Sequence, residues 1–175
     1  VQSGWLDYIN PQIYFPFGYQ VAPFDKLLDW WSNNTFGKHL YVGQGVYRAL
    51  ENRPGWSDRS QIPKQIRYLR SNKNTQGSVF FSSKSVTNNM AGVKDSLRKD
   101  FYRYPALQPA MPWLEDVKPN APTVLTAKAI AKGVELSWQA PAVASDGDKD
   151  FGYVIYRDNR GERMDTEQAH HIRNI

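Results

Sequence analysis

The sequence predicts an α/β protein with a parallel sheet, followed by a shorter all-β part. Three apolar runs of β-forming residues, at 13–15, 40–42 and 79–81, each end in hydrogen-bonding side chains. Helical periodicity fills the intervals between them, and strand–helix order of this kind is typical of parallel sheets with crossovers packed on the outer face. After residue 122 apolar and polar residues alternate instead, which is typical of a β-sandwich.

The three predicted strands lie within Asp7–Gly18, His39–Leu50 and Gly77–Val86. The second contains a short run of β-formers followed at once by glycine and glutamine, a pattern that suits a fully buried strand.

Three helices are predicted between and after these strands, at Phe24–Asn33, Gln61–Asn72 and Gly92–Tyr102. In the first, apolar residues recur at spacings of one, three and four, so Trp31 is expected in the core and Trp30 at an edge. Pro residues near the starts of the first two helices fit their first turns, where a missing N–H costs nothing.

A proline-rich segment predicts the domain boundary. Five prolines lie within Tyr104–Pro122, a density at which no regular element is expected. We therefore predict domains at 1–104 and 123–175, joined by a linker at 105–122. In the second domain, strands are expected at Thr123–Ile130, Gly133–Gln139 and Phe151–Asp158.

Composition excludes several classes of protein. The net charge is +5, but Lys and Arg lie beside Asp and Glu on helical patterns, so we expect solvated faces and no nucleic-acid partner. There is no cysteine, which excludes disulfides and thiolate metal sites, and no cofactor is expected. No apolar run approaches ~18 residues, so no transmembrane segment is predicted. The chain opens without a signal-peptide pattern, as expected of a mature form or a fragment.

No metal site is predicted, although Asp146, Asp148 and Asp150 begin like a calcium-binding loop. An EF-hand needs Gly at the sixth position and Glu at the twelfth, where this chain has Phe151 and Arg157. A solvated loop between strands is the preferred interpretation.

Candidate ligand-binding residues follow the predicted strands, because α/β proteins bind ligands at the carboxyl ends of parallel strands. Gln44 stands between Gly43 and Gly45, and the alternative is a turn whose glutamine caps its own backbone. Trp56 lies in a Pro-Gly loop and is expected to be exposed. The full candidate set is Gln12, Tyr14, Gln44, Tyr47, Trp56, Ser82, Ser83 and Lys84.

Four motifs, DYINPQIYFPFG, DKLLDWWS, HLYVGQGVYR and GSVFFSSKSV, resemble the C-terminal half of the glycosyl-hydrolase-like 10 family, in the family's order. Its members occur as exported bacterial proteins, so the resemblance implies a periplasmic or cell-surface location. The stretches ELSWQAP and GYVIYRD resemble a fibronectin type III domain.

The first resemblance implies a (β/α)8 TIM-type barrel, of which this chain would supply the last three βα units, with sites at the strand ends. The candidate residues would then line a cleft for a polysaccharide, such as peptidoglycan glycan strands. Gln12, Gln44 and Lys84 would hydrogen-bond the sugar, and Tyr14 and Tyr47 would stack on it, with Trp56 as a further aromatic wall.

The catalytic residues stay unknown, because glycoside hydrolysis needs two carboxylates and none of the three strand ends carries one. We therefore expect a fragment of a glycoside hydrolase that contributes cleft-lining residues. The alternative is a non-catalytic carbohydrate-binding or structural module. About 55 residues follow the linker, against ~100 in a complete sandwich, so the second domain is expected to be incomplete. Open sheet edges would then favour self-association.

Overall fold

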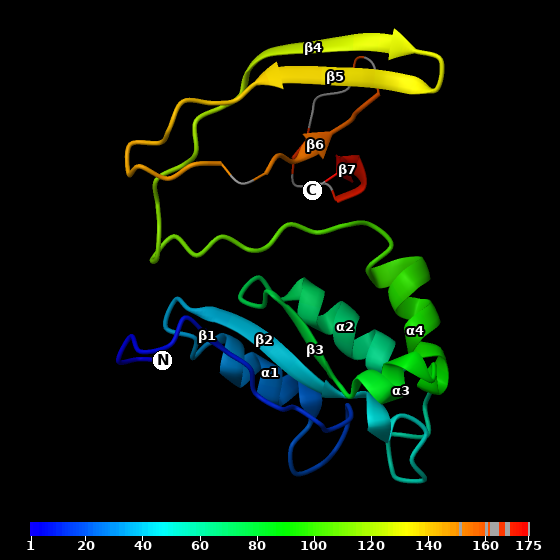
Figure 1. The fold of residues 1–175 in the computed structure, drawn as a ribbon. Helices are drawn as coiled ribbons and strands as arrows, with labels where there is room; N and C mark the ends of the chain where they lie inside the picture. Colours follow the sequence, from blue (N-terminus) through cyan, green and yellow to red (C-terminus); the bar gives the residue numbers. More distant parts are fainter. Residues whose placement is uncertain (151, 160, 162–164, 167–168, 175) are drawn as a thin grey trace. The chain divides into compact units, whose positions relative to one another are not determined.

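The computed structural model describes residues 1–150, 152–159, 161, 165–166 and 169–174. The chain forms two compact units, Val1–Pro109 and Ala110–Ile175. We describe each unit by itself (Figure 1).

The first unit is built on a three-stranded parallel sheet in the order β1-β2-β3. Its strands are β1 (Tyr8–Ile9), β2 (His39–Gly45) and β3 (Gly77–Phe81). The predicted parallel order is confirmed for strands within the three predicted stretches, although the apolar run at 13–15 lies outside the regular part of β1.

The first strand is shorter than predicted, because prolines interrupt it. Regular pairing covers only Tyr8–Ile9, and Pro11 has no N–H to donate. The chain nevertheless stays beside β2, because Gly43 N donates to Pro11 O at 2.9 Å and Ile13 N donates to Gly43 O at 3.0 Å. Gln12 forms a parallel bridge to Gly43. The segment up to Tyr14 therefore continues the sheet without being a regular strand.

The second strand, predicted within His39–Leu50, continues past the apolar run at 40–42 and ends at Gly45. A short 3-10 helix, η1 (Val46–Arg48), follows it. The Gly43–Gly45 stretch lies inside β2, not in a turn beyond it. Because side chains alternate along a strand, Leu40, Val42 and Gln44 point to one face. On that face Leu40 and Val42 pack with helix residues.

Two helices cover this face of the sheet, α1 (Phe24–Ser32) and α2 (Gln61–Ser71). Both positions agree with the predictions to within one residue. Leu28 of α1 and Leu69 of α2 pack in one cluster with the strand residues, so the two helices lie on the same side of the sheet (Figure 1). Trp31 packs against this cluster, while Trp30 is 57% exposed, as the spacing predicted.

The last helical part of the unit is more broken than the predicted single helix at Gly92–Tyr102. A 3-10 turn, η2 (Met90–Gly92), leads into α4 (Val93–Ser96) and then into a π-helix, η3 (Leu97–Phe101). A further short helix, α3 (Ser83–Thr87), follows β3 directly and was not predicted. Val93 and Phe101 are buried beside α2, so the apolar spacing predicted the buried residues correctly. It did not predict the type of helix.

The second unit contains two antiparallel pairs, β4 (Thr123–Ile130) with β5 (Gly133–Gln139), and β6 (Ile155–Tyr156) with β7 (Ile172–Asn174). The predicted third strand at Phe151–Asp158 is regular only over β6, and Phe151 itself lies outside the described residues. Residues 105–122 carry no helix or strand. Among the described residues, no helix has the length and apolar character needed to cross a membrane.

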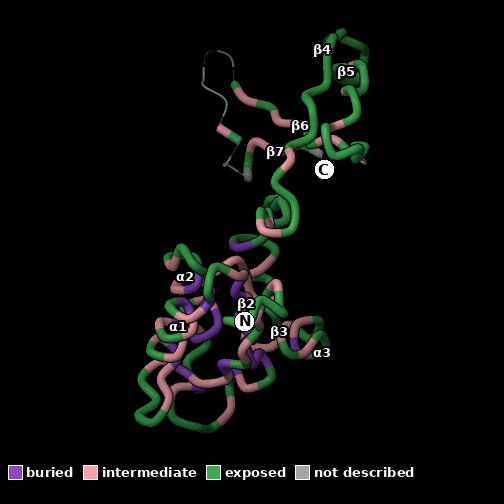
Figure 2. Tube along the Cα trace, turned by 90° about the vertical axis from the view of Figure 1, so that its left-hand side faces the viewer, coloured by how far each residue is buried: buried purple, intermediate pink, exposed green. Residues whose placement is uncertain are grey.

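Most residues of the β4–β5 hairpin are exposed (Figure 2). Alternation along the strands gives the hairpin one polar and one apolar face. On the polar face the hydroxyls of Thr126 and Ser137 are 2.7 Å apart. On the other, Val134 and Leu136 are exposed and Trp138 is half-buried. The alternation in Gly133–Gln139 predicts that these three residues pack inward, but within the described part of the unit Val134 and Leu136 are not covered. Self-association through open sheet edges stays a prediction.

Gln44 belongs to the core, contrary to the prediction that it faces a ligand. Its side chain is fully buried, and Nε2 donates to Gln65 Oε1 of α2 at 3.2 Å. Gln65 Nε2 in turn donates to Phe15 O at 3.1 Å. Strand periodicity explains the placement, because Gln44 shares the helix-facing side with Leu40 and Val42. The pair ties α2 to two segments of the sheet.

Replacing Gln44 by Ala should therefore destabilise the chain by about 1–3 kcal/mol, because the Gln65 amide oxygen loses its partner inside the core. Urea unfolding of the whole chain measures this loss. The exposed Gln20→Ala provides the control and should change stability by less than ~0.5 kcal/mol. Equal stabilities for Gln44→Ala and the wild type would contradict the structural role.

Candidate functional site

The face of the sheet opposite the helices carries a group of aromatic residues at the carboxyl ends of the strands. Gly45 of β2 pairs with Phe81 of β3 on one side and packs against Tyr14 on the other. In a parallel sheet, residues paired across strands point to the same face. Tyr14 and Phe81 thus lie on either side of a position with no side chain.

Three rings meet there, and we call Tyr14, Tyr47 and Phe81 the aromatic platform. The rings of Tyr14 and Phe81 are stacked, with centroids 6.0 Å apart and planes 23° apart. Tyr47, from η1, meets both edge-on, at 6.0 Å from Tyr14 and 5.8 Å from Phe81. Tyr47 is 41% and Phe81 54% exposed, so the platform presents ring surface to solvent.

Gly45 makes this arrangement sterically feasible. A Cβ at this position would lie 3.1 Å from Cγ and 3.2 Å from Cβ of Tyr14, and 3.4 Å from Cγ of Arg48. Its φ of −82° suits any residue, so the need for glycine comes from the neighbouring ring and not from backbone strain. The glycine of the predicted motif thus makes room for an aromatic side chain.

The platform changes the chemistry of Tyr14. Burial raises the pKa of the Tyr14 hydroxyl above its ordinary value of 10, and the charge that Tyr47 would carry raises it further. The hydroxyl therefore stays neutral over the physiological range and can both donate and accept a hydrogen bond.

The other predicted residues divide between the platform's surroundings and the core. Gln12 is exposed, and its bridge to Gly43 places it on the same face as the platform. Ser82, Ser83 and Lys84 follow Phe81 into α3. The Ser82 carbonyl accepts from the amides of the first turn, while Ser83 and Lys84 are exposed.

Trp56 is not an exposed wall of a cleft, as its Pro-Gly context had suggested. It is only 2% exposed and packs with Val46, Ile62 and Ile66 in the second core cluster. The guanidinium of Arg48 covers its ring at 5.6 Å. The loop folds back over the start of α2, a tertiary contact that local sequence does not reveal. With Gln44 and Trp56 removed, six of the predicted residues remain candidates.

Two carboxylates near the strands, Glu51 after β2 and Asp7 before β1, are both engaged in contacts. Glu51 Oε2 is 3.3 Å from Arg48 Nη2 and 3.6 Å from Arg53 Nε. Asp7 precedes β1 and its carbonyl accepts from His39 N, so it lies at the opposite, amino-terminal end of the strands. Neither acidic residue resembles a free general acid or base beside the platform.

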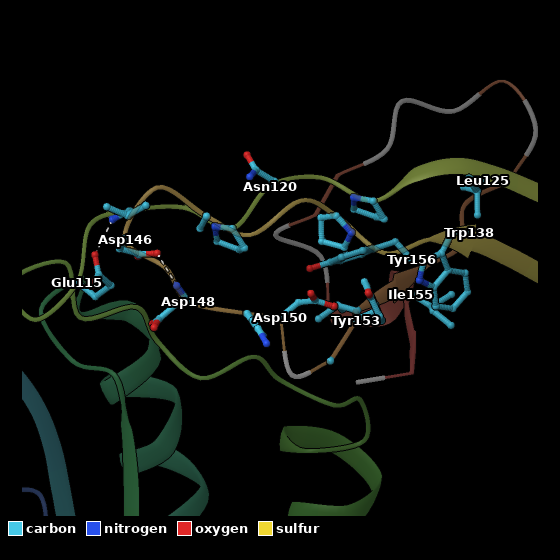
Figure 3. A pocket seen from close by; sticks show the side chains of 18 of the residues that line it. Glu115, Asn120, Leu125, Trp138, Asp146, Asp148, Asp150, Tyr153, Ile155 and Tyr156 are labelled. Carbon is cyan, nitrogen blue, oxygen red and sulfur yellow. Dashed lines mark hydrogen bonds between the residues drawn. The ribbon is translucent and has the colours of Figure 1, made fainter.

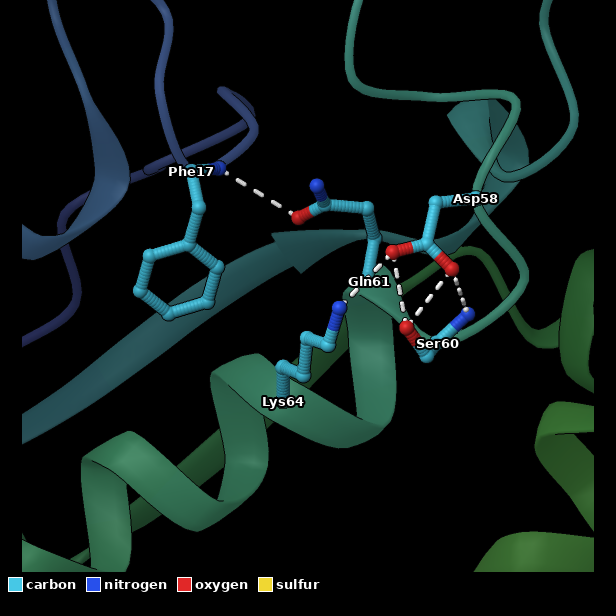
Figure 4. A network of polar contacts seen from close by, with 5 residues as sticks. All are labelled: Phe17, Asp58, Ser60, Gln61 and Lys64. Carbon is cyan, nitrogen blue, oxygen red and sulfur yellow. Dashed lines mark hydrogen bonds and ion pairs between the residues drawn. The ribbon is translucent and has the colours of Figure 1, made fainter.

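Asp58 organises the start of α2 (Figure 4). Its carboxylate accepts from Ser60 N at 2.8 Å, from Ser60 Oγ at 2.6 Å, and from Lys64 Nζ at 2.9 Å. These hydrogen bonds, led by that of Ser60, lower the pKa of Asp58 to about 2. A general acid in a glycoside hydrolase needs a raised pKa, and that of Asp58 is lowered. We therefore assign Asp58 a structural role at the N-terminus of α2.

The second unit contains a hollow of about 640 Å³ (Figure 3). Trp138, Tyr153 and Tyr156 lie at one end, and acidic residues including Asp146 and Asp148 lie at the other. The rings of Trp138 and Tyr153 meet edge-on at 5.1 Å. Among the described residues, little covers the apolar face of the β4–β5 hairpin at this end, so we interpret the hollow as incompletely covered core.

The acidic residues of the loop that bounds this hollow accept hydrogen bonds from backbone amides of the same loop. Asp148 N donates to Asp146 Oδ1 at 2.9 Å, and Ala144 N donates to Asp148 O at 3.2 Å. Within the described part of the chain, no group of three or more potential ligands is placed to hold a metal ion.

Comparison with known proteins places the chain beside glycosyl hydrolases. It is 44% identical over 125 residues to glycosyl hydrolase YngK of Bacillus subtilis (strain 168), an alignment covering 70% of this chain. It is 28% identical over 123 residues to glycosyl hydrolase DigH of Escherichia coli (strain K12), covering 66% of this chain. In both cases the match spans 24% of the relative's own length. No family model matches the chain. These relatives support a glycosyl hydrolase-like protein.

Phe81 is the platform residue that the sequence-based prediction missed. It was assigned only to an apolar strand core, together with Val79 and Phe80. The structure separates them, because Phe80 packs toward the helices and Phe81 points the other way. Alternation within GSVFF shows that neighbouring residues face opposite sides, but not which of them faces the helices.

Gly45→Ala should displace the Tyr14 ring and expose it. The pKa of Tyr14 should then fall toward 10, because the burial that raises it is lost. Alkaline absorbance titration measures this, with Tyr14→Phe identifying which transition belongs to Tyr14. Gly152→Ala is the matched control, since a Cβ there meets nothing within 4 Å. An unchanged Tyr14 titration in Gly45→Ala would contradict the steric account.

Asp58→Asn should lower stability near neutral pH, because the carboxylate's hydrogen bonds are weakened. The folded-state pKa lies below the unfolded value of 3.8, so the stabilisation is fully present above that value. It is lost as the pH falls through about 2. Urea unfolding of both proteins across this range should show the difference between them shrinking to zero. A difference that stays constant down to the lowest pH would refute the assignment.

Proposed function

We propose that the first unit supplies an aromatic sugar-binding surface to a glycoside hydrolase acting on a polysaccharide. The observation that carries the proposal is the aromatic platform at the carboxyl ends of three parallel strands, the position where α/β proteins bind ligands. The similarity to proteins named glycosyl hydrolase supports a carbohydrate as the ligand.

The chemistry of the platform suits a sugar. One face of a pyranose ring is covered by C–H groups, and it packs well on aromatic rings that keep a polar group at their edge. Tyr14 and Tyr47 supply such hydroxyls, and Phe81 adds apolar surface. Gln12 on the same face and Ser83 and Lys84 beyond β3 would hydrogen-bond the sugar hydroxyls or an acidic substituent.

The catalytic carboxylates would come from elsewhere in a longer protein. Glycoside hydrolysis needs an acid and a base or nucleophile on opposite sides of the bond. Of the carboxylates described above, Glu51 and Asp58 are held by basic side chains and Asp7 lies at the far end of the sheet. This favours a binding role for the chain alone, the alternative that the sequence left open.

We further propose that the three strands and their helices belong to a (β/α)8 barrel. Their parallel pairing in sequence order, with helices between the strands, suits such a barrel. The exposed residues of the platform face would line its interior. The second unit is proposed to be a fibronectin III-like sandwich, supported by its amphipathic hairpin. Peptidoglycan glycan as the substrate and export from the cell are predictions from the resemblance.

Binding of soluble glycan strands to the whole chain tests the platform. Phe81→Ala and Tyr47→Ala should each weaken binding by about 5- to 30-fold, because an aromatic contact of about 1–2 kcal/mol is lost. Isothermal titration calorimetry measures the affinity, and the chain alone should show no glycosidase turnover.

The control variant is Trp30→Ala, which removes an equally exposed aromatic residue from α1 on the other side of the sheet. It should leave binding unchanged. Loss of affinity in all three variants alike would indicate non-specific aromatic contact. Unchanged affinity in both platform variants would contradict the proposed function.

A further inference from the structure

The two tyrosines of the aromatic platform come from separate segments that need a physical connection. Tyr14 follows β1, and Tyr47 lies in η1 after β2. The residue next to Tyr47 provides that connection, because Arg48 Nη1 donates to the backbone carbonyl of Tyr14 at 3.1 Å. Arg48 spans the gap between segments more than thirty residues apart in the sequence.

The guanidinium is fixed on its other sides. Its Nε and Nη2 lie 3.4 Å and 3.3 Å from Glu51 Oε2, and its Cζ lies over the Trp56 ring at 5.6 Å. The Arg48 side chain is 19% exposed, and Trp56 is part of the core. A planar guanidinium with several donors can serve a carbonyl and a carboxylate together, which a lysine ammonium does less well.

We propose that Arg48 is the positioning residue of the aromatic platform. It clamps the Tyr14 backbone against the short helix that carries Tyr47, and so sets the edge-on contact between the two rings. Glu51 orients Arg48 and does not act as a catalytic acid or base. Only the glycan measurement below depends on the proposed function.

Arg53 shows that pairing with Glu51 alone does not make a positioning residue. It also approaches Glu51, at 3.6 Å, but its side chain is 69% exposed. Surface pairs of this kind contribute little. Arg53 therefore provides the matched control, since its removal changes the charge by the same amount and leaves Tyr14 untouched.

The test uses ring-to-ring NOEs between Tyr14 and Tyr47 in the whole chain, together with glycan affinity. Arg48→Met keeps an unbranched side chain against Trp56 but has no donor. It should lose the NOEs and weaken glycan binding by about fivefold, the equivalent of one hydrogen bond. Arg53→Ala should retain both. Glu51→Gln should also retain both, because its amide oxygen still accepts from Arg48.

If Arg48→Met does not fold, Glu51→Ala carries the same test, because it releases the guanidinium without emptying the space beside Trp56. Retained ring NOEs in a folded Arg48→Met or Glu51→Ala variant overturn the proposal, whatever the glycan result. Lost NOEs in a protein whose wild type binds no glycan support the positioning role and contradict the proposed function instead. The ring NOEs therefore test the positioning role of Arg48, and glycan binding by the wild type tests the proposed function.

Discussion

The pairing of β2 with a neighbour on each side is the constraint on which the first unit depends. Its strict alternation sends Leu40, Val42 and Gln44 toward the helices and leaves glycine at two of the intervening positions. The helix-facing residues form the core. Because the glycines have no side chains, the opposite face has free space at the centre of the sheet, and aromatic residues of the flanking segments meet there. One strand thereby specifies both the stable side and the accessible side of the unit.

The elements with strong local signals could be predicted from the sequence. The helices at 24–32 and 61–71 show clear apolar spacing, and the parallel order follows from strand–helix repetition. Helix type near residue 97 could not be predicted, because apolar spacing of four fits α- and π-turns alike. Whether this sheet belongs to a barrel remains a proposal, since that depends on segments beyond three strands.

The candidate site was only half predictable, for a physical reason. Tyr14 was found as the polar member of an apolar run, and Tyr47 because it comes soon after one. Gln44 was misplaced because the strand was ended too early. Alternation counted from Leu40 would have assigned Gln44 to the core. Trp56 is different, since its burial depends on contacts with Ile62 and Ile66 that exist only after the loop folds over α2. Long-range packing of this kind has no local sequence signal.

The uneven distribution of burial between the units has a consequence for how the chain responds to heat and proteases. Among the described residues, Ile172 is the single buried apolar residue of the second unit, whereas both core clusters belong to the first. Local opening costs least where little apolar surface is removed from water. Proteases should therefore cut the proline-rich stretch and the hairpin long before they reach β2, and leave the platform intact on a resistant core.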